Sequence, residues 1–354
     1  MQATESNIED VNHIISMNTA YQSENKLYYN KKDILIYNED CITGIDKLIK
    51  SKKQIHLTIT SPPYFNVKDY VEYENYKKYL LFLESLFTKI YTITRPGRIC
   101  CVNISNILII RKNRNSESKR IPLAFHFVLL MEKIKWEFLE DIIWVKPEGA
   151  AKNRNGGFYQ HRQPVAYKPN VVNEYIFVFK KPSPHLIDKV VRSYNALDSL
   201  NSKVEDGYER SNVWKINPET RGKHPAPYPI ALTDKLIQYY SFTGDTILDP
   251  FMGSGTTALS AIKYNRKCIG FEIHSKYIDM FKERASEVQP MSLISRIDLN
   301  KEEYVELSKE EALEKILKHN KKFLHAVCKN NSIDFKGELK MELAKGIYTK
   351  LFTI

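Results

Sequence analysis

Two short segments of this chain combine residue types that suit chemistry on an amino group. The first is Thr60-Ser61-Pro62-Pro63-Tyr64. Each proline fixes its own φ angle and has no N–H group, so a peptide carbonyl can point inward without a competing donor. Ser61 adds an acceptor, and Tyr64 offers a flat face for a base taken out of a duplex. Accepting hydrogen bonds from both N–H groups draws a delocalised amino nitrogen toward tetrahedral geometry, which makes it nucleophilic. The structural alternative is that the prolines only end a strand and Tyr64 returns to the core.

The second segment, Asp249 to Thr257, contains the glycine loop Gly253-Ser254-Gly255. A phosphate-binding P-loop needs a lysine after its last glycine, and a threonine follows here, so that ligand is excluded. A dinucleotide fits the pattern G-x-G-x-x-A, with Glu272 about twenty residues further on. Asp249 would repel a pyrophosphate, whereas it suits S-adenosylmethionine, which carries a sulfonium and an ammonium. The structural alternative is that Asp249 caps the next helix and the glycines only permit close packing.

Composition indicates a globular protein with a polyanionic partner. Of the 354 residues, 43% are hydrophobic, which suffices for one large α/β core and a smaller appendage. The 53 basic and 42 acidic side chains give a formal charge of +11, which favours a nucleic acid partner. Charge alone does not decide this, because a lysine-rich chain also reflects the base composition of a genome.

The cysteines and the amino terminus argue against other classes of protein. Five scattered cysteines, without CxxC spacing or paired histidines nearby, predict neither a disulfide framework nor a metal site. Residues 1–12 are polar and acidic, unlike a signal peptide. No stretch approaches the roughly 18 apolar residues that cross a bilayer. We therefore expect a cytoplasmic protein with no membrane partner.

The elements that must position the two segments alternate between strand and helix. Apolar runs predict strands at 34–37, 56–60, 98–104, 140–145, 174–179, 246–248 and 268–272. Apolar residues at every third or fourth position predict helices at 45–49, 76–92, 122–134, 230–240 and 258–264. This alternation predicts a doubly wound α/β sheet. A polar, helical arm precedes it and ends in a turn at Tyr29–Lys32, and a charged helical extension follows Pro290.

With their flanks, the two segments resemble the amino-methyltransferases of bacterial restriction–modification systems. The resemblance is to the beta subgroup, in which the catalytic motif precedes the cofactor loop, and it runs from about Ile34 to Arg284. The motifs that carry it, in the family's order, are Asp40-Cys41, Thr60 to Tyr64, Ile143-Trp144-Val145-Lys146-Pro147, His224-Pro225-Ala226-Pro227-Tyr228-Pro229, Asp249 to Thr257 and Phe271-Glu272.

The resemblance implies S-adenosyl-L-methionine as cofactor and a Rossmann-like methyltransferase sheet in circularly permuted order. The catalytic residues it implies are Ser61, Pro62, Pro63 and Tyr64. The cofactor-binding residues it implies are Asp40, Thr60, His224, Pro225, Ala226, Asp249, Phe251, Gly253, Ser254, Gly255, Thr256 and Glu272. The expected regions are an arm (1–30), the target-base half (31–148), a small recognition region with part of the core sheet (149–221), the cofactor half (222–289) and a helical extension (290–354).

The residue at position 61 bears on the target base. Family members that methylate N6 of adenine usually have aspartate there, and those that methylate N4 of cytosine usually have serine. Ser61 therefore favours N4 of a flipped cytosine, with N6 of adenine as the alternative. Methylation at cytosine C5 needs a cysteine nucleophile, typically after a proline, and no cysteine here follows one. More remote alternatives are an NAD-dependent oxidoreductase and a nucleic-acid-binding protein without catalysis.

Two basic clusters suggest where double-stranded DNA is held. One is Arg111-Lys112-Asn113-Arg114 with Lys119-Arg120, and the other runs from Lys152 to Gln163. Taken singly these are ordinary surface charges, and as clusters they fit phosphate clamps. The predicted DNA contacts are Arg111, Lys112, Arg114, Lys146, Lys152, Arg154 and Arg162. The sequence leaves open the recognition sequence, a cognate restriction endonuclease, and the choice between monomer and homodimer.

Overall fold

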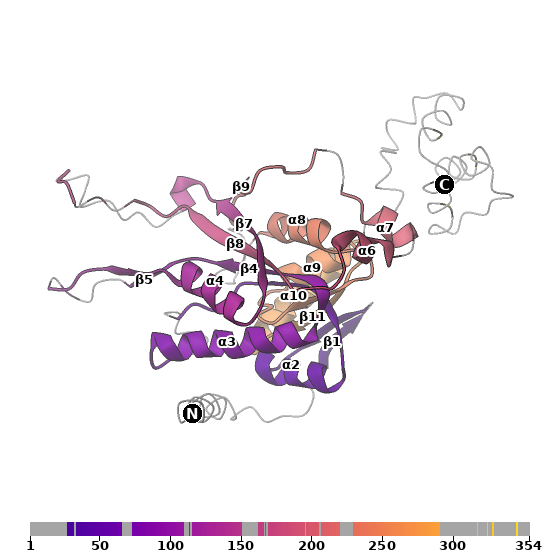
Figure 1. Cartoon of the computed structure of the whole chain (residues 1–354), viewed down its shortest axis with the longest axis horizontal. Coiled ribbons are helices and arrows are strands. Elements are labelled where there is room, and N and C mark those ends of the chain that lie inside the picture. The colour runs from indigo at the N-terminus through magenta and orange to yellow at the C-terminus, as the bar shows by residue number, and fades with distance from the viewer. Residues whose placement is uncertain are drawn as a thin grey trace.

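The computed structural model of the protein describes residues 27–31, 33–65, 73–109, 113, 115–150, 162–165, 167, 169–194, 196–204, 207–219 and 229–290, with single positions at 317, 324, 328 and 345. Residues 27–290 of this set form an α/β domain in which helices cover both faces of a central sheet (Figure 1).

A nine-stranded mixed sheet forms the middle layer, in the order β1-β2-β11-β10-β3-β4-β8-β7-β9. Strands β2, β11, β10, β3 and β4 run parallel, and β8 runs antiparallel to β4 and β7. The late strands β10 and β11 therefore lie in the middle, between β2 and β3. The strand bounds are β1 Leu27–Lys31, β2 Ile34–Tyr37, β3 Ile55–Thr60, β4 Thr94–Ile104, β7 Glu137–Val145, β8 Asn173–Lys180, β9 Val213–Lys215, β10 Thr246–Asp249 and β11 Lys267–Phe271.

Helices cover both faces of this sheet. One face carries α2 (Cys41–Lys50), α3 (Tyr76–Ile93) and α4 (Leu123–Lys133). The other carries α8 (Ile230–Tyr240), α9 (Thr256–Lys263) and α10 (Ser275–Glu287). A separate ribbon of β5 (Ile107–Ile109) and β6 (Lys119–Ile121) projects at the left of Figure 1. The remaining elements are η2 (Glu148–Ala150), α6 (Ile187–Arg192) and α7 (Ala196–Asn201).

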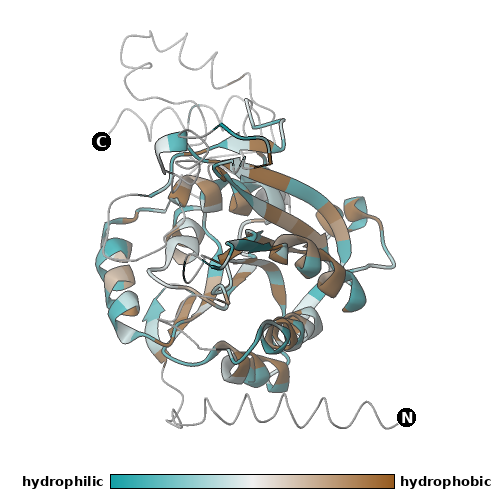
Figure 2. Cartoon of the chain, turned by 90° about the vertical axis from the view of Figure 1, so that its left-hand side faces the viewer, coloured by the Kyte–Doolittle hydropathy of each residue, from teal (hydrophilic) through white to brown (hydrophobic). Residues whose placement is uncertain are grey.

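Alternate residues of the central strands supply two separate cores. In β4, Cys100 and Val102 pack with α2, α3 and α4, whereas Ile99 and Cys101 pack with α8, α9 and α10. This follows from the period of two in a strand. Because both faces are covered, the central strands are buried on both sides and rich in apolar residues, which made them visible in the sequence. Figure 2 shows these hydrophobic strands between helices that also carry hydrophilic residues.

The residues after the strands explain why β2 and β3 end at one edge of the sheet. Neither Pro62 nor Pro63 can donate to a sheet ladder, so β3 ends at Thr60. After β2, Asp40 caps helix α2, because its Oδ1 accepts from the N–H groups of Ile42 at 3.0 Å and Thr43 at 3.1 Å. Both segments therefore turn out of the sheet at its carboxyl edge.

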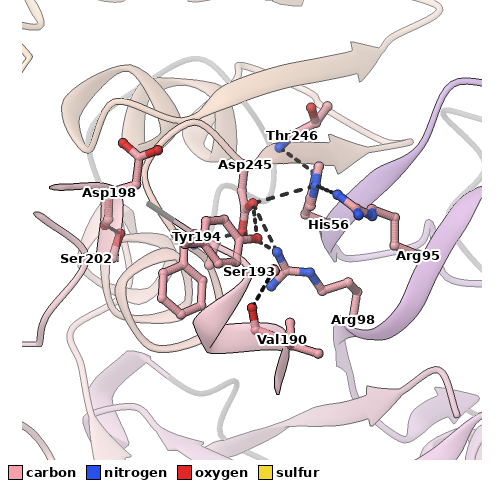
Figure 3. Close-up of polar contacts among 12 residues, drawn as sticks. His56, Arg95, Arg98, Val190, Ser193, Tyr194, Asp198, Ser202, Asp245 and Thr246 are labelled. Atoms are coloured by element: carbon pink, nitrogen blue, oxygen red, sulfur yellow. Dashed lines mark hydrogen bonds and ion pairs between the residues drawn. The ribbon is translucent and has the colours of Figure 1, made fainter. Parts of the chain in front are cut away.

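A buried ion pair holds the opposite, amino edge of the sheet (Figure 3). Arg98 of β4 and Asp245, just before β10, are 5% and 2% exposed. Their Nη2 and Oδ1 atoms lie 3.1 Å apart. Asp245 also accepts from the hydroxyl of Tyr194 at 2.6 Å, and the Tyr194 ring stacks on Phe242 with centroids 4.1 Å apart. These contacts dock the segment after α6 against the start of β10.

The strands and helices predicted from the sequence within the described residues are present, with ends that differ by a few positions. The turn predicted at Tyr29–Lys32 is wrong, because Leu27–Lys31 forms the edge strand β1, antiparallel to β2. Its exposed edge position explains its polar sequence. The fading pattern after Pro182 hid α6, α7 and β9. Residues 1–26 of the predicted arm, and nearly all of the extension, lie outside the described residues. Within the described part of the chain, no helix combines the length and apolar character needed to cross a membrane.

Candidate active site

The two segments singled out in the sequence meet at the carboxyl edge of the sheet. They follow β3 and β10, which are parallel neighbours. The Thr60 hydroxyl donates to Asp249 Oδ1 at 3.1 Å, and both residues are buried. This hydrogen bond joins residues 189 positions apart in the sequence. Ligands of open α/β sheets bind at this edge, so the fold brings the predicted catalytic and cofactor segments into one site.

Asp249 organises the site from a fully buried position, with 0% exposure. Besides Thr60, its Oδ1 accepts from the N–H of Phe251 at 3.1 Å, and its Oδ2 accepts from the Thr257 hydroxyl at 2.7 Å. One carboxylate therefore connects strand β3, the start of the glycine loop and the first turn of α9. Its negative charge lies directly beneath the loop, where the sequence predicted a cationic ligand.

Backbone N–H groups of the glycine loop form hydrogen bonds within the loop region and with Glu272, which follows β11. The Gly253 N–H donates to Glu272 Oε2 at 2.9 Å, and the Gly255 N–H donates to the Met252 carbonyl at 2.9 Å. Burial raises the pKa of Glu272, and hydrogen bonds from the N–H groups of His274 and Gly253 oppose that shift. Gly255 has φ +81°, and a Cβ there would lie 2.4 Å from the Phe281 ring, so this position requires glycine.

This arrangement can be tested against the two ligands that fit the glycine pattern. A phosphate needs backbone N–H groups directed at it, whereas those of Gly253 and Gly255 bond to the protein itself. A phosphate bound at this loop would also lie between the carboxylates of Asp249 and Glu272, which would repel it. A cofactor with a sulfonium and an ammonium gains from the same carboxylates. The residues present therefore fit S-adenosylmethionine and do not fit a pyrophosphate.

Three more predicted cofactor residues surround this loop. Asp40 follows β2, the neighbour of β11, and its carboxylate caps α2. Phe251 packs near Phe82 of α3, with ring centroids 6.3 Å apart. Ser254 is 5% exposed, and Arg284 of α10 donates to both its carbonyl and its hydroxyl oxygen at 3.2 Å. Arg284 was not singled out in the sequence, because an arginine within an amphipathic helix resembles an ordinary surface residue.

The segment Ser61 to Tyr64 runs out from the sheet beside this loop. Pro62 is buried, and Ser61, Pro63 and Tyr64 are half-buried. The hydroxyl of Tyr64 is buried and has no hydrogen-bond partner among the described residues. Burial raises the pKa of this hydroxyl, and the charge of Glu174 adds to the shift. Tyr64 therefore packs against the core on the side of α2, α3 and α4, while part of its side chain stays accessible.

A polar cluster that the sequence did not reveal lies at the same edge. Glu174 of β8 accepts a hydrogen bond from Asn103 Nδ2 of β4 at 2.7 Å. The ammonium of Lys146, after β7, forms an ion pair with Glu174 and lies 4.4 Å from the centroid of the Trp144 ring. Lys146 was singled out as a DNA contact, but its charge is matched by Glu174. No local signal distinguished Asn103 or Glu174 from other strand residues.

Among the remaining predicted residues, Thr256 is buried at the start of α9, and the others are either accessible or outside the described residues. Arg162 is exposed and has φ +47°. Lys119 and Arg120 are exposed on β6. The predicted site residues that lie outside the described residues are Arg111, Lys112, Arg114, Lys152, Arg154, His224, Pro225 and Ala226. Among the described residues, no three His, Cys, Asp or Glu side chains form a metal-binding group.

Fold and site together define an α/β enzyme that binds a nucleoside cofactor at the carboxyl edge of a parallel sheet. The protein belongs to the DNA methylase family, whose model matches residues 55–283, most of the chain. This membership agrees with the amino-methyltransferase class expected from the motifs. It also supports S-adenosyl-L-methionine as the cofactor.

Several named methyltransferases are similar to this chain. Type II methyltransferase M.ScaI of Streptomyces caespitosus is 29% identical over 267 residues, which cover 72% of this chain and 82% of that protein. Type II beta methyltransferase M.BslI of Bacillus sp. (strain NEB-606) is 30% identical over 236 residues, 64% of this chain. The chain matches only 25% of the length of M.BslI.

Solved structures share the fold. PvuII DNA methyltransferase (cytosine-N4-specific) matches with a TM-score of 0.53 and 20% identity, over 74% of this chain and 89% of that one. A DNA modification methylase of Thermus thermophilus, complexed with S-adenosyl-L-methionine, matches with a TM-score of 0.52 and 24% identity, over 71% and 92%. At these identities the likeness establishes the Rossmann-like methyltransferase fold.

Proposed function

We propose that the protein transfers a methyl group from S-adenosyl-L-methionine to the exocyclic N4 of a cytosine flipped out of double-stranded DNA. The observation that carries this proposal is the Thr60–Asp249 hydrogen bond, which fixes Ser61 to Tyr64 beside the glycine loop. It holds the acceptor groups for an amino base next to the carboxylates that suit the cofactor. N6 of adenine is the alternative acceptor.

The residues of the catalytic segment act on the amino group of the base. Carbonyl oxygens beside Pro62 and Pro63, together with the Ser61 hydroxyl, accept its two N–H groups. The ring of Tyr64 stacks on the base, a contact worth about 1 to 3 kcal/mol. Serine in place of aspartate at position 61 supports cytosine as the target, because this position differs between the two kinds of amino-methyltransferase in the family that the sequence resembles.

The cofactor half of the site holds S-adenosyl-L-methionine, which supplies the methyl group. Asp249 places negative charge beneath the glycine loop, and Glu272 lies across it as an acceptor for ribose hydroxyls. Ser254 and Phe251 border the same loop, and Arg284 fixes the Ser254 carbonyl. The segment from His224 to Ala226 is proposed to hold the methionine end of the cofactor.

Exposed basic residues near this edge supply the DNA contacts. Lys119 and Arg120 lie on the projecting β5–β6 ribbon, and Arg162 lies in the predicted recognition region. The formal charge of +11 favours the approach of DNA to this surface. The insertion of β10 and β11 between β2 and β3 supports the circularly permuted motif order. Protection of DNA in a restriction–modification system is the proposed role.

The decisive experiment is mass spectrometry of nucleosides from DNA treated with the protein and labelled cofactor. N4-methyldeoxycytidine is the expected product. N6-methyldeoxyadenosine would correct the base and keep the enzyme class, and unlabelled DNA with both bases intact would contradict the proposal. Ser61→Ala is expected to lower methyl transfer at least 100-fold while the cofactor Kd changes less than about 2-fold. Ser193→Ala, on an exposed turn after α6, is the matched control.

A further inference from the structure

Three side chains at the carboxyl edge form a cluster that the predicted motifs do not explain. Asn103 is the second-last residue of β4, Glu174 is the second residue of β8, and Lys146 follows β7. Glu174 uses one oxygen for Lys146 and the other for Asn103 Nδ2, which lies at 2.7 Å. Its two carboxylate oxygens thus bind side chains from two different segments of the chain, β4 and the residue after β7. Such a cluster fixes the orientation of all three groups.

The cluster leaves one buried acceptor without a donor. Because a carboxylate only accepts hydrogen bonds, the amide nitrogen of Asn103 must face Glu174 and the amide oxygen must face away from it. Asn103 is 6% exposed. Its Oδ1 is buried and has no hydrogen-bond partner among the described residues. Buried polar atoms nearly always have a hydrogen-bond partner in folded proteins, so an oxygen without one calls for an explanation. A donor group of a ligand would supply the missing partner.

Strand register places this oxygen beside the catalytic segment. Thr60 of β3 pairs with Val102 of β4 in the parallel ladder. Ser61 is the first residue after β3, and Asn103 directly follows the partner of Thr60 in β4, so the two residues leave this last pair in the same direction. Tyr64 lies close enough for the charge of Glu174 to act on its hydroxyl. The cluster thus lies beside the segment that is proposed to bind the base.

We infer that Asn103 Oδ1 shares with the Ser61 hydroxyl the hydrogen bond from one N–H of the exocyclic amino group of the target base, and that Glu174 and Lys146 are positioning residues that hold Asn103 in this orientation. The inference deepens the proposed function and rests on an amino base as the substrate. Asn103 touches the substrate, whereas Glu174 acts through it. Lys146 neutralises Glu174 and so has a role other than contact with a DNA phosphate.

The test compares Asn103→Ala, Glu174→Gln and the double variant with the wild-type protein. Single-turnover methyl transfer is expected to fall about 10-fold or more in Asn103→Ala and about 3-fold or more in Glu174→Gln. The double variant is expected to be no slower than Asn103→Ala alone, because Glu174 acts through Asn103. Cofactor Kd is expected to stay within about 2-fold. Glu137→Gln is the matched control, since Glu137 pairs with Lys180 across the same two strands at their other end.

A second measurement separates contact with the base from support of the fold. Once the methylated site is mapped, duplexes carry at that position either the natural base or its analogue without the amino group. Wild-type protein is expected to bind the natural duplex more tightly, and Asn103→Ala is expected to lose about 5-fold or more of this preference. A purely structural role would lower Tm and leave the preference unchanged.

The outcomes of the two tests distinguish the two proposals. Full methylation rate with unchanged preference in Asn103→Ala would overturn the inference and leave the proposed function intact. Methylation of adenine N6 by the wild-type protein would correct the target base of the proposed function, and loss of rate in Asn103→Ala would still support the inference, because adenine also presents an exocyclic amino group. If Asn103→Ala fails to fold, Glu174→Gln carries the test, because glutamine keeps the size of glutamate but can also donate to Asn103, and so no longer fixes which end of the amide faces it. Equal loss of rate in Glu174→Gln and Glu137→Gln would overturn the inference.

Discussion

His56 provides a sharp test of how the amino edge of the sheet is built. It lies in β3, and the backbone N–H of Thr246 in β10 donates to its Nδ1 at 3.1 Å (Figure 3). Arg95 Nη1 lies 3.0 Å from its Nε2, and Asp245 Oδ1 lies 3.7 Å away. Protonation of Nδ1 would place two N–H groups against each other. Burial lowers the pKa of His56 to about 4, although Asp245 acts in the opposite direction and Arg98 assists the shift.

The size of the effect follows from the pKa. In the unfolded chain the pKa is 6.5, so a folded value of about 4 corresponds to about 3 kcal/mol at full titration. The folded value is the lower one, so the unfolded chain binds the proton more tightly and stability falls as the pH falls. The stabilisation is complete above pH 6.5 and is lost between about pH 6.5 and pH 4. The loss is about 1 kcal/mol at pH 5.5 and about 2 to 3 kcal/mol at pH 4.5.

The assay is urea unfolding of the wild-type protein and His56→Asn from pH 7.5 to pH 4.5. Asparagine can still accept from the Thr246 N–H and does not titrate in this range. As the pH falls, the wild-type protein is expected to lose free energy of unfolding relative to His56→Asn by the amounts above. His185→Asn, at an exposed loop position, controls for the loss of a histidine. Parallel pH profiles of wild type and His56→Asn would refute the reasoning.

Three further changes test the cofactor loop and the DNA surface. Asp249→Asn is expected to weaken binding of S-adenosyl-L-methionine at least 10-fold in calorimetry, because the charge beneath the loop is removed; unchanged affinity would contradict a charge role for this residue. Gly255→Ala is expected to lower the free energy of unfolding by about 2 to 4 kcal/mol, through strain at positive φ and overpacking. Gly207→Ala, with φ +80° but open space around it, should cost only about 1 kcal/mol. Arg120→Ala is expected to weaken DNA binding and reduce its salt slope by about one, whereas Lys189→Ala on α6 should not.

Much of the fold could be predicted because its elements are locally encoded. The strands around Leu57 and Leu248 are buried and rich in apolar residues, since helices cover both of their faces. The prolines at positions 62 and 63 end their strand by their own chemistry. In contrast, β1 is a polar edge strand whose only structural partner among the described strands is β2, so its sequence resembles a loop. Short elements such as α6 carry too few residues for a periodic pattern.

The candidate site was predictable where neighbouring residues carry the chemistry. Ser61 to Tyr64 and the glycine loop are contiguous motifs, and each indicates its ligand by residue type and spacing. Asn103 and Glu174 carry no such signal, because an amide and a carboxylate in strands are common surface residues. Their role follows only from the 2.7 Å contact that brings them together. Lys146 is a different case: its motif was visible in the sequence, but its ion-pair partner Glu174 was not.

The sequence by itself determined the buried central strands and the longer helices, the two motifs and the charge balance, because propensity and residue chemistry depend on near neighbours. Only the tertiary structure decided which distant groups meet. The hydrogen bond from Thr60 to Asp249 spans 189 positions, and it exists because β3 and β10 are adjacent in the sheet. Strand order and register set such contacts through the packing of two whole cores. No short stretch of sequence contains that information, which is why the cluster around Asn103 emerged only from the fold.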